Sequence, residues 1–428
     1  MRAVGLITEY NPFHNGHLYH LRESLRLADA DVAVAVMSGH FLQRGEAALV
    51  DKWARTEMAL AAGVDVVVEL PLPWACNSAS HFAEGAIHSL QRLGGVDRIC
   101  FGSESGDVDR LQRCATFLHE NEAAIEADTR PRVRQGLTWP AARAAVVEAR
   151  APDSDFSRLL QTPNNILGLS YLRALLRTGA DMLPLTIRRI GAGYHGSEVI
   201  DGIASATGIR QRLANDESVS GLLPGEVHDL LQKEFRAGRV LEGDALFRLV
   251  AGRLLLGAGR MPDIYQFEPG METTLCRAAQ TASDLEGLLM EAKPRHLTRT
   301  RLQRLLCYLL LDLTNREMDE ALEHGPLYLH LLGVSPRGMK FLSRRRKQRQ
   351  VPLVQNYSRV HAQLSRFYGR GSRRQLAARR QLDLELRASR IYTLAVRQWT
   401  SAERNRDFTE ELRWSAQSSS VDQSAGAQ

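Results

Sequence analysis

Cysteine is scarce in this sequence and follows no spacing pattern. The five cysteines of the 428-residue chain are scattered, odd in number and never spaced C-x-x-C. Their distribution argues against a disulfide framework and against a structural zinc site. The sequence predicts no metal site built from protein side chains.

Long apolar runs are also missing. The longest, near residues 305–311, is far short of the roughly 20 residues that a membrane-spanning helix needs. The N-terminal segment turns polar after a few apolar residues, which is unlike a signal peptide. With 44% apolar and 24% charged residues, the composition is that of a folded protein. We expect a cytoplasmic protein of two or three domains without membrane contact.

Acidic residues are depleted in one part of the chain. Residues 1–289 carry 29 Lys and Arg against 36 Asp and Glu, whereas residues 290–410 carry 25 against 11. Between Arg344 and Leu382 there are 12 basic residues and no acidic one. Positive charge concentrated on one part of a protein favours a polyanionic partner. The alternative is that long solvated helices carry the excess charge.

Aromatic residues are interleaved with these arginines, namely Tyr357, Phe367 and Tyr368. Basic side chains can follow a phosphate backbone, and aromatic rings can stack on unpaired bases. We therefore predict an RNA-binding surface; in the alternative interpretation the aromatic residues belong to the core. A second basic cluster lies at residues 293–304. The predicted RNA contacts are Arg344, Arg345, Arg346, Lys347, Arg349, Arg373 and Arg374.

The first 105 residues alternate short apolar runs with helical patterns. Apolar strands joined by helices are typical of a parallel sheet covered on both faces. The predicted strands are residues 3–7, 32–37, 64–70 and 97–101, with a fifth at 184–190. The helices expected between them are residues 16–28, 52–62 and 82–90. The predicted fold class is therefore α/β, with a Rossmann-like sheet.

The rest of the chain is predicted to be mainly helical. Residues 107–182 have the pattern of a helical insertion, and leucine-rich segments predict helices at 219–257, 273–292, 299–313 and 374–400. The tail is rich in Ser, Gln and Ala and is expected to be disordered. The predicted division is a nucleotide-binding domain at 1–215, a mostly α-helical basic domain at 216–414 and the tail at 415–428.

The strongest functional signal is Gly5-Leu-Ile-Thr-Glu-Tyr-Asn-Pro-Phe-His14-Asn-Gly16-His17, where the first strand ends and the first helix begins. Ligands bind at this edge of an open parallel sheet, and a helix N-terminus favours phosphate there. Two imidazoles three residues apart can both reach phosphate oxygens. H-x-G-H in this context resembles the signature of the HIGH-type nucleotidyltransferases. The alternative is that His14 and His17 only cap a helix.

A second motif supports the first. Ser205, Thr207 and Arg210 resemble the S-[ST]-T-x-[IL]-R segment that closes over the triphosphate in that superfamily. Hydroxyl groups at a helix start, with an arginine one turn later, suit phosphate oxygens. We predict His14, His17, Thr207 and Arg210 as the catalytic residues. They would position the nucleotide and stabilise the charge that develops during displacement of pyrophosphate.

Further residues are expected at the same edge of the sheet. Ser38 and Gly39 follow the second strand, and Gly102 follows the fourth. Two pairs flank the fifth strand: Asn164 with Asn165, and Arg188 with Arg189. An asparagine could bind a ribose or a base edge, and an arginine could clamp a phosphate.

Together these segments resemble the bacterial tRNA(Met) cytidine acetate ligase family. The motifs that carry the resemblance span residues 4–210 in order: V-G-L-I-T-E-Y-N-P-F-H-N-G-H, A-V-M-S-G-H-F-L-Q-R-G-E, D-K-W-A-R, F-G-S-E, P-N-N-I-L-G, R-I-G-A-G-Y-H and S-A-T-G-I-R.

The resemblance implies a ligase reaction. ATP and acetate would form acetyl-adenylate and pyrophosphate. The acetyl group would then pass to N4 of the wobble cytidine in the anticodon of elongator tRNA(Met), giving N4-acetylcytidine and AMP. Mg²⁺ would bind through the phosphates and water, and the basic C-terminal region would bind the tRNA.

The resemblance also implies the ATP contacts. They map to Ile7, Thr8, Glu9, Tyr10, Asn11, Pro12, Phe13, His14, Asn15, Gly16, His17, Leu18, Tyr19, His20, Gly102, Asn165 and Arg189. Further candidates are Ser38, Gly39, Asn164, Arg188 and Ser205. No motif marks the acetate pocket or predicts an oligomeric state.

Two other functions share part of these signals. A cofactor-biosynthesis adenylyltransferase has the H-x-G-H motif but needs no basic helical extension of this length. A non-catalytic RNA-binding protein with a vestigial nucleotide fold needs none of the phosphate-handling residues, yet His14, His17, Thr207 and Arg210 are all present.

Overall fold

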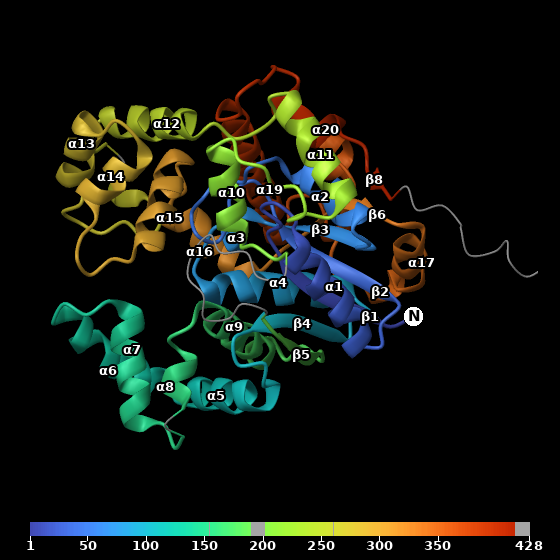
Figure 1. Ribbon diagram of the computed structural model, residues 1–428, viewed down its shortest axis with the longest axis horizontal. Helices are drawn as coiled ribbons and strands as arrows, with labels where there is room; N and C mark the ends of the chain where they lie inside the picture. The colour runs from blue at the N-terminus through green and yellow to red at the C-terminus, as the bar shows by residue number, and fades with distance from the viewer. Residues whose placement is uncertain (154, 190–201, 260, 416–428) are drawn as a thin grey trace, which may run out of the picture.

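A parallel sheet forms the centre of the molecule (Figure 1). The computed structural model describes residues 1–153, 155–189, 202–259 and 261–415. The five predicted strands are present and parallel to one another, which confirms the α/β fold class. They are β1 (Ala3–Thr8), β2 (Val32–Ser38), β3 (Val66–Leu70), β4 (Arg98–Ser103) and β5 (Leu183–Arg188).

The order of the strands indicates at which edge of the sheet a ligand would bind. Along the sheet the order is β5-β4-β1-β2-β3-β6-β7, so the chain continues from β1 to β2 on one side while β4 pairs with β1 on the other. The crevice beyond the carboxyl ends of β1 and β4 is therefore the switch point at which open sheets bind ligands. Every residue of β2 is buried, as expected where helices cover both faces.

Helices cover the two faces of the sheet in two groups. Leu6 and Ala35 face one apolar cluster, to which four helices contribute. Val34 and Val68 face the other cluster, in which four helices pack against the strands and helices farther from the sheet add more residues. The first group is α1 (Asn15–Leu27), α2 (Lys52–Ala61), α10 (Ala206–Ala214) and α11 (Gly225–Arg236). The second is α4 (Ala79–Leu93), α5 (Val108–Glu120), α9 (Pro163–Thr178) and α17 (Pro336–Arg344).

The segment between β4 and β5 is helical, as predicted. Besides α5 and α9 it contains α6 (Glu122–Arg134), α7 (Trp139–Arg150) and α8 (Phe156–Leu159). Figure 1 shows these helices extending below and to the left of the sheet. They lengthen the connection from β4 to β5 without altering the parallel pairing of the two strands.

The C-terminal region is mostly helical, but the sequence analysis missed three strands in it. The missed strands are β6 (Leu329–Val334), β7 (Leu353–Val354) and β8 (Arg413–Trp414). β6 extends the sheet by pairing antiparallel with β3. A six-residue apolar run cannot be assigned to strand rather than helix from its periodicity alone. The domain boundary at residue 215 stays a prediction.

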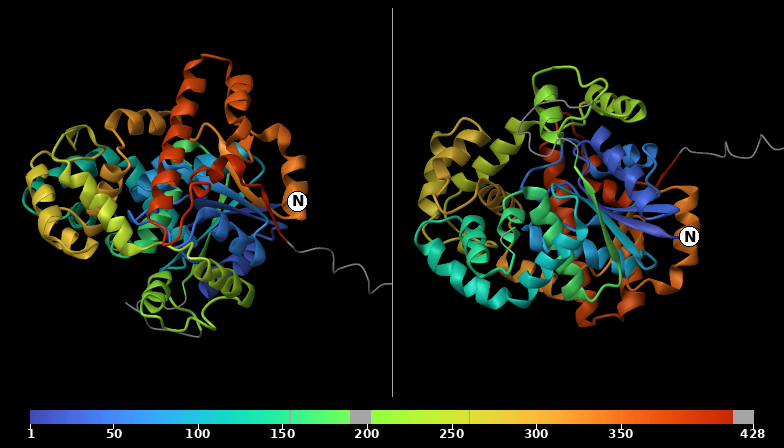
Figure 2. Two further views of the ribbon diagram at one scale, coloured as in Figure 1. Left: turned by 90° about the horizontal axis from the view of Figure 1, so that it is seen from above. Right: turned by 60° about the horizontal axis from the view of Figure 1, so that its bottom comes forward.

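Two helical groups flank the sheet. One packs around its own apolar cluster, which also includes Phe41 and Ala47. It contains α3 (Leu72–Ala75), α12 (Gly243–Leu255), α13 (Glu272–Thr281), α14 (Leu285–Ala292), α15 (Arg299–Leu310) and α16 (Asn315–His324). The other is the pair α18 (Val360–Tyr368) and α19 (Arg373–Leu394), which projects from the body in the left panel of Figure 2. A short helix, α20 (Arg406–Thr409), precedes β8.

All five cysteines are free thiols, as predicted. In the part of the chain that the structure describes, no helix combines the length and apolar character needed to cross a membrane. The predicted tail lies outside the described residues except for Ser415.

Candidate active site

The two motif histidines cap α1. His14 is the N-cap residue, and its Nδ1 accepts a hydrogen bond from the Gly16 N–H at 3.0 Å. The His14 N–H donates to Nδ1 of His17 at 3.3 Å. A Cβ on Gly16 would lie 2.8 Å from Cε1 of His14, so glycine leaves room for the His14 ring. The two rings lie 3.8 Å apart between centroids.

These capping bonds fix the tautomer of each ring. A neutral imidazole that accepts a hydrogen bond at Nδ1 carries its proton at Nε2. His14 and His17 therefore both cap the helix and retain an Nε2–H donor. Capping and phosphate binding are compatible roles, because they use different ring nitrogens.

Burial holds the three histidines of α1 in the neutral form. Burial, with a smaller contribution from Arg189, lowers the pKa of His14 to about 3 and that of His20 to about 4. Burial and then His14 and His20 hold the pKa of His17 well below its ordinary value. At neutral pH these rings therefore add hydrogen-bond donors to the site without adding charge.

The ends of β4 and β5 bring together the second group of predicted residues. Arg189 is exposed and lies across Gly102, where an added Cβ would be 3.2 Å from its Cγ. The Glu104 carboxylate accepts from the Asn165 N–H at 2.7 Å and from Nδ2 of Asn164 at 2.7 Å. Oδ1 of Asn165 accepts from the N–H groups of Glu104 and the following residue. Asn165 thus holds the loop after β4, and of its side chain only Nδ2 is left for a ligand.

The third group lies at the start of α10. The Ser205 hydroxyl caps this helix by accepting from the Gly208 N–H at 3.0 Å. Arg210 donates to the Asn11 carbonyl at 2.9 Å and to the Glu46 carboxylate at 3.0 Å. Thr207 is exposed. Through Arg210 and Asn11 the structure joins the two sequence motifs, which are almost 200 residues apart.

A hairpin between β2 and α2 completes the site. Phe41 pairs antiparallel with Ala47, and we call residues 41–47 the site hairpin. The Gln43 N–H at its tip donates to Glu9 at 2.8 Å. Burial raises the pKa of Glu9 above its ordinary value against the lowering effect of this bond, and Glu46 adds to the rise. The predicted residues Ser38 and Gly39 lead into the hairpin.

Arg55 fixes the site hairpin to the sheet. Its fully buried guanidinium donates to the carbonyl groups of Glu9 at 2.7 Å and Ser38 at 2.9 Å, and also to that of Gly39. Sequence analysis assigned no role to this arginine or to Glu46. The available signal was an arginine within an otherwise apolar helical pattern, in the D-K-W-A-R motif.

Of the other residues predicted within 7–20, some are buried and pack beneath the histidines, and others lie at the surface beside them. Tyr10 and Phe13 are buried, and the Tyr10 ring meets the His17 ring edge-on at 5.0 Å. Ile7 and Leu18 pack against the two cores, whereas Tyr19 is exposed. The remaining predicted residues of this segment are Thr8, Asn11, Pro12 and Asn15, and Arg188 is exposed beside Arg189. Of the R-I-G-A-G-Y-H motif, only Arg189 is among the described residues. Residues 190–195 lie outside them.

Several buried polar atoms here have no hydrogen-bond partner within the described structure. They are Asn11 Nδ2, His20 Nε2 and Ser38 Oγ, whereas the Thr8 and Tyr10 hydroxyl groups lie close enough to bond to each other. A buried polar group without a partner costs about 1–3 kcal/mol. Such a group needs an explanation, for which a bound ligand or water is the usual one. Asn11 follows β1 and Ser38 ends β2, so both of these atoms are available to a ligand at this edge of the sheet.

A buried ionic cluster lies behind the site. Glu69, His330 and Asp407 offer ligand atoms within 4.8 Å of one another, a spacing that would suit a metal ion. The Lys52 ammonium already binds Glu69 at 2.9 Å and Asp407 at 2.6 Å. Burial alone would lower the pKa of Lys52, but Asp407 and Glu69 outweigh burial and raise it. The lysine therefore supplies the positive charge of this cluster.

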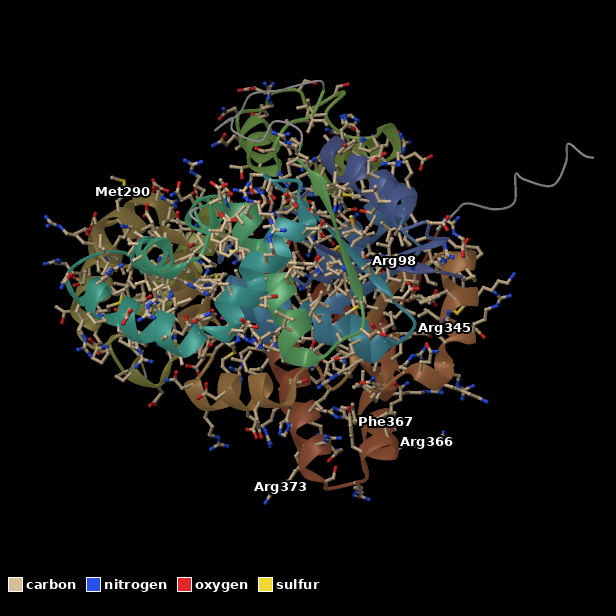
Figure 3. The ribbon with its side chains drawn as sticks, turned by 90° about the horizontal axis from the view of Figure 1, so that it is seen from below. Arg98, Met290, Arg345, Arg366, Phe367 and Arg373 are labelled. Carbon is tan, nitrogen blue, oxygen red and sulfur yellow. The ribbon has the colours of Figure 1, made fainter. Side chains whose placement is uncertain are left out.

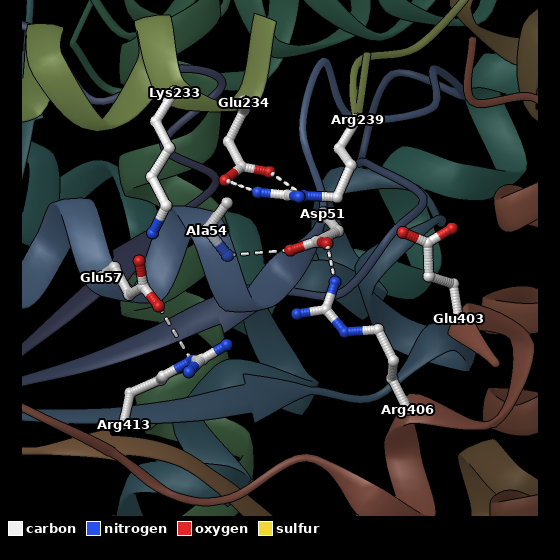
Figure 4. A pocket seen from close by; sticks show the side chains of 9 residues that line it. All are labelled: Asp51, Ala54, Glu57, Lys233, Glu234, Arg239, Glu403, Arg406 and Arg413. Carbon is white, nitrogen blue, oxygen red and sulfur yellow. Dashed lines mark hydrogen bonds and ion pairs between the residues drawn. The ribbon is translucent and has the colours of Figure 1, made fainter. Parts of the chain in front are cut away.

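A cavity of about 220 Å³ lies between α2, α11 and α20, away from the histidines (Figure 4). Six of its eight charged side chains form ion pairs: Arg239 with Glu234, Arg406 with Asp51, and Arg413 with Glu57 at 3.0 Å. The other two, Lys233 and Glu403, carry opposite charges. This balance leaves no net charge to attract an ionic ligand.

The predicted RNA contacts divide into tethered and free residues. Arg345 donates to the Met1 carbonyl at 3.2 Å, and Arg349 to the Leu342 carbonyl at 3.4 Å. The other predicted contacts are exposed and have no carboxylate partner among the described residues: Arg344, Arg346, Lys347, Arg373 and Arg374.

The aromatic residues of this region differ in how far they are exposed. Tyr357 is buried against Tyr328, so it is a core residue and the prediction that it could stack on a base is wrong. The Tyr368 hydroxyl donates to the Leu327 carbonyl at 2.6 Å. Phe367 is 51% exposed. Figure 3 shows it on the same face as Arg366 and Arg373.

The second basic cluster, at residues 293–304, is compensated in part, since Lys293 and Arg295 are exposed and have no carboxylate partner among the described residues. Arg299 pairs with Glu286, and Arg301 pairs with Glu268 at 2.6 Å. Arg304 is buried and donates to the Gln43 carbonyl of the site hairpin at 3.3 Å. These arginines stabilise the fold around the site.

Comparisons with known proteins agree with the geometry. Residues 1–407 match the family described as HIGH Nucleotidyl Transferase. The chain is 52% identical over 413 residues to the tRNA(Met) cytidine acetate ligase of Syntrophotalea carbinolica, covering 96% of this chain and 98% of the relative. It is 37% identical over 424 residues to the protein of the same name from Acetivibrio thermocellus, covering 96% and 99%.

Solved structures agree as well. The crystal structure of Thermotoga maritima TmcAL bound with alpha-thio ATP superposes with a TM-score of 0.88 at 31% sequence identity. The similarity covers 97% of this chain and 99% of that one. The apo form of the same protein gives a TM-score of 0.89.

Proposed function

This chain belongs to the tRNA(Met) cytidine acetate ligases within the HIGH nucleotidyl transferase family, and from that premise we propose the reaction and the residues that carry it out. The enzyme is an ATP-dependent ligase that acetylates tRNA(Met). An acetate oxygen attacks the α-phosphorus of ATP, pyrophosphate leaves, and acetyl-adenylate forms. The N4 amino group of the wobble cytidine of elongator tRNA(Met) then attacks the acetyl carbon, loses a proton and displaces AMP.

The observation that carries this proposal is the state of His14 and His17. Both rings are neutral, both carry the proton at Nε2, and both stand at the N-terminus of a helix whose dipole favours anions. In the first step negative charge moves onto the departing pyrophosphate. Two fixed Nε2–H donors stabilise that charge without reorganising, which is the main way such sites lower a barrier.

The remaining ATP contacts follow from their positions. Arg189, exposed beside Gly102, would bind the α-phosphate or the ribose side. Arg210 and Thr207, at the start of α10, would bind the β- and γ-phosphates. Asn165 Nδ2 would bind the ribose or base edge, with Asn164 engaged by Glu104. ATP is thus held between α1, the end of β4 and α10.

Mg²⁺ would be carried by the triphosphate and water. The carboxyl groups at the site suit direct ligation poorly, because burial raises the pKa of Glu9 and Glu46 is bound to Arg210. Magnesium prefers octahedral oxygen ligands and keeps several waters. When bound, it would neutralise part of the phosphate charge.

The tRNA would bind through the C-terminal basic region. The supporting observation is that Arg344, Arg346, Lys347, Arg373 and Arg374 are exposed and lack carboxylate partners among the described residues. Arginines without such partners retain their charge for phosphate groups. Arg345 and Arg349, which bind backbone carbonyl groups, would support this surface.

The decisive experiment is exchange of radiolabelled pyrophosphate into ATP, with and without acetate and without RNA. We expect exchange that requires acetate. His17→Ala should lower the exchange rate by about 10²–10³, the usual effect of removing one donor to a developing anion. Exchange that proceeds equally without acetate would contradict the acyl-adenylate.

A matched control separates chemistry from folding. His228 on α11 is partly exposed and lies outside the site. His228→Ala should leave both the exchange rate and the thermal unfolding temperature unchanged. A His17→Ala protein that unfolds like the wild type but fails in exchange places the defect in the reaction.

A further inference from the structure

One surface of the C-terminal region carries basic charge that the fold does not compensate. We call it the basic face: Arg344, Arg346, Lys347, Arg366, Phe367, Arg370, Arg373 and Arg374. All eight side chains are exposed, and no described carboxylate pairs with any of the seven cations. By contrast, Arg380 and Arg387 further along α19 are paired with Glu320 and Glu317. The positive charge is therefore concentrated at the α18–α19 end.

The basic face is continuous. Arg345, at the end of α17, packs against Gly95 after α4. Arg92, on the last turn of α4, accepts at its carbonyl a hydrogen bond from the Gln350 N–H at 2.8 Å and donates to the Pro326 carbonyl. Burial chiefly lowers the pKa of its guanidinium, and Tyr368 and Arg374 lie near enough to affect that pKa as well. The segment after α17 and the α18–α19 pair thus adjoin one another around Arg92, and Figure 3 shows Arg345, Arg366 and Arg373 on one side of the molecule.

This face lies far from the reacting atoms. The Ser389 hydroxyl is 3.2 Å from His40, beside the site hairpin, and the Tyr392 hydroxyl donates to the Ala48 carbonyl at 3.0 Å. Arg373 lies at the other end of the same helix, α19. A helix rises 1.5 Å per residue, so Arg373 is roughly 28 Å from Tyr392. α19 therefore separates the basic face from the catalytic edge.

The length of β1 gives a second estimate of the distance between the basic face and the histidines. Arg345 binds the carbonyl of Met1, before β1, whereas His14 follows the far end of that strand. Six strand residues span about 20 Å. The α17 part of the basic face therefore lies at the opposite edge of the sheet from the histidines.

We propose that the basic face binds the tRNA substrate outside its anticodon arm, while the wobble cytidine occupies the catalytic edge. The proposal rests on the proposed function and adds a second, remote contact to it. An anticodon loop placed at the histidines cannot itself reach a surface this far away. The cations then bind backbone phosphates of the tRNA body.

Phe367 gives this contact its chemical character. It is half exposed between Arg366 and the Arg370–Arg374 segment. Its ring meets the Tyr368 ring edge-on at 4.9 Å between centroids, and its exposed half is open to a partner. Paired bases in a stem are closed to stacking, whereas unpaired bases stack on aromatic rings. Since the anticodon loop is at the catalytic edge, the base that stacks on Phe367 belongs to another unpaired segment of the tRNA.

The test compares two RNA substrates of the full-length enzyme: the complete tRNA(Met) transcript and its isolated anticodon stem and loop. Acetylation is measured as a function of RNA concentration for Phe367→Ala and for the double variant Arg373→Glu/Arg374→Glu. With the complete tRNA we expect KM to rise about tenfold for Phe367→Ala, the size of one lost stacking contact, and more for the double variant. Phe367→Tyr should retain the wild-type KM.

With the stem and loop alone, the same variants should match the wild type within about twofold. Equal losses on both RNAs would place the contact inside the anticodon arm and overturn the proposal. Unchanged KM on both would overturn it as well. Arg130→Glu/Arg134→Glu on exposed α6 is the charge-matched control and should change neither value.

Acetate-dependent pyrophosphate exchange without RNA tests the ligase reaction separately from tRNA binding by the basic face. If exchange and stem-loop acetylation both occur in the wild type, the proposed function holds whatever the basic face does. If exchange fails, the function is wrong, and loss of tRNA binding in the variants alone would not restore it.

Discussion

At the scale of single residues, Glu46 forms an ion pair with Arg210, the arginine that is proposed to bind the triphosphate. Its carboxylate accepts from Nη2 of Arg210 at 3.0 Å, and both side chains are only partly exposed. Any phosphate that binds Arg210 meets this negative charge at close range. Glu46 thus acts as a counterion to be displaced or shared when ATP arrives.

Replacing this counterion should strengthen nucleotide binding. We expect Glu46→Gln to lower the Kd for a non-hydrolysable ATP analogue by about three- to tenfold, since removing a partly exposed charge changes the free energy by about 1 kcal/mol. Isothermal titration calorimetry measures the Kd directly. Glu217→Gln, which removes a carboxylate 3.6 Å from Arg212 on the same helix, is the control and should leave the Kd unchanged. Weaker binding by Glu46→Gln would show that Glu46 positions Arg210 instead.

The residues of the site were predicted unevenly from the sequence. His14, His17 and Arg210 stand in short motifs whose chemistry depends on local spacing, so they could be found without a fold. Glu46 and Arg55 act through partners 164 and 46 residues away, and no local pattern reveals such a pairing. Tyr357 was ambiguous for the same reason, because its sequence neighbours are basic while its spatial neighbours are aromatic.

At the scale of elements, the site hairpin is wedged between the sheet and α15. Gly45 has a φ of +76° and lies so close to α15 that an added Cβ would be 2.2 Å from the Arg304 nitrogen. The Cys307 thiol also lies 3.4 Å from the Gly45 carbonyl. The site hairpin, which carries Glu46 next to Gly45, therefore depends on this glycine for its position.

Gly45→Ala should disturb both stability and catalysis. Left-handed backbone strain costs about 1–3 kcal/mol, and overpacking costs a similar amount. We expect a loss of about 2–5 kcal/mol in urea unfolding and a lower kcat for exchange. Gly257→Ala is the control, since Gly257 has a φ of +89° and open space around its Cα. It should show the backbone strain alone and normal exchange; equal effects would mean that the contact with α15 is unimportant.

Helices and strands were predicted well from the sequence where the residues of the element itself have a recognisable apolar pattern. β1 and β2 are nearly continuous runs of buried residues, most of them apolar, and β5, although exposed at both ends, still has apolar residues at alternate positions. β6 was missed because its pairing with β3 crosses more than 260 residues, while its leucines fit a helix equally well. Local periodicity reports which face of an element is apolar but not which element covers it.

At the scale of the whole molecule, buried neutral histidines tie stability to pH. Burial is the main cause that lowers the pKa of His40 to about 3, and Lys52 adds to it. The unfolded value is near 6.5. Since the folded state binds the proton less well, the contribution of His40 to stability is present above pH 6.5 and is lost as the pH falls from there toward about 3.

The slope should follow the number of such histidines. Each adds up to about 1.4 kcal/mol of stability per pH unit in this range, whereas Glu9 and Glu385, with raised pKa values caused chiefly by burial, act in the opposite sense. We expect the free energy of unfolding to fall less steeply between pH 6.5 and 5 in His40→Gln than in the wild type. Urea unfolding at both pH values measures this difference, and parallel slopes would contradict the assigned state of His40.

The pairing of β3 with β6 also affects how the chain is made. A ribosome releases β3 long before β6 has been synthesised, so for most of translation the nascent sheet presents an open edge of valine-rich strand. The final contacts come later still, when Asp407 emerges and binds Lys52. The buried cluster behind the nucleotide site is therefore completed only after Asp407 has left the ribosome, and a nascent chain stalled before β6 exposes an unpaired strand to chaperones.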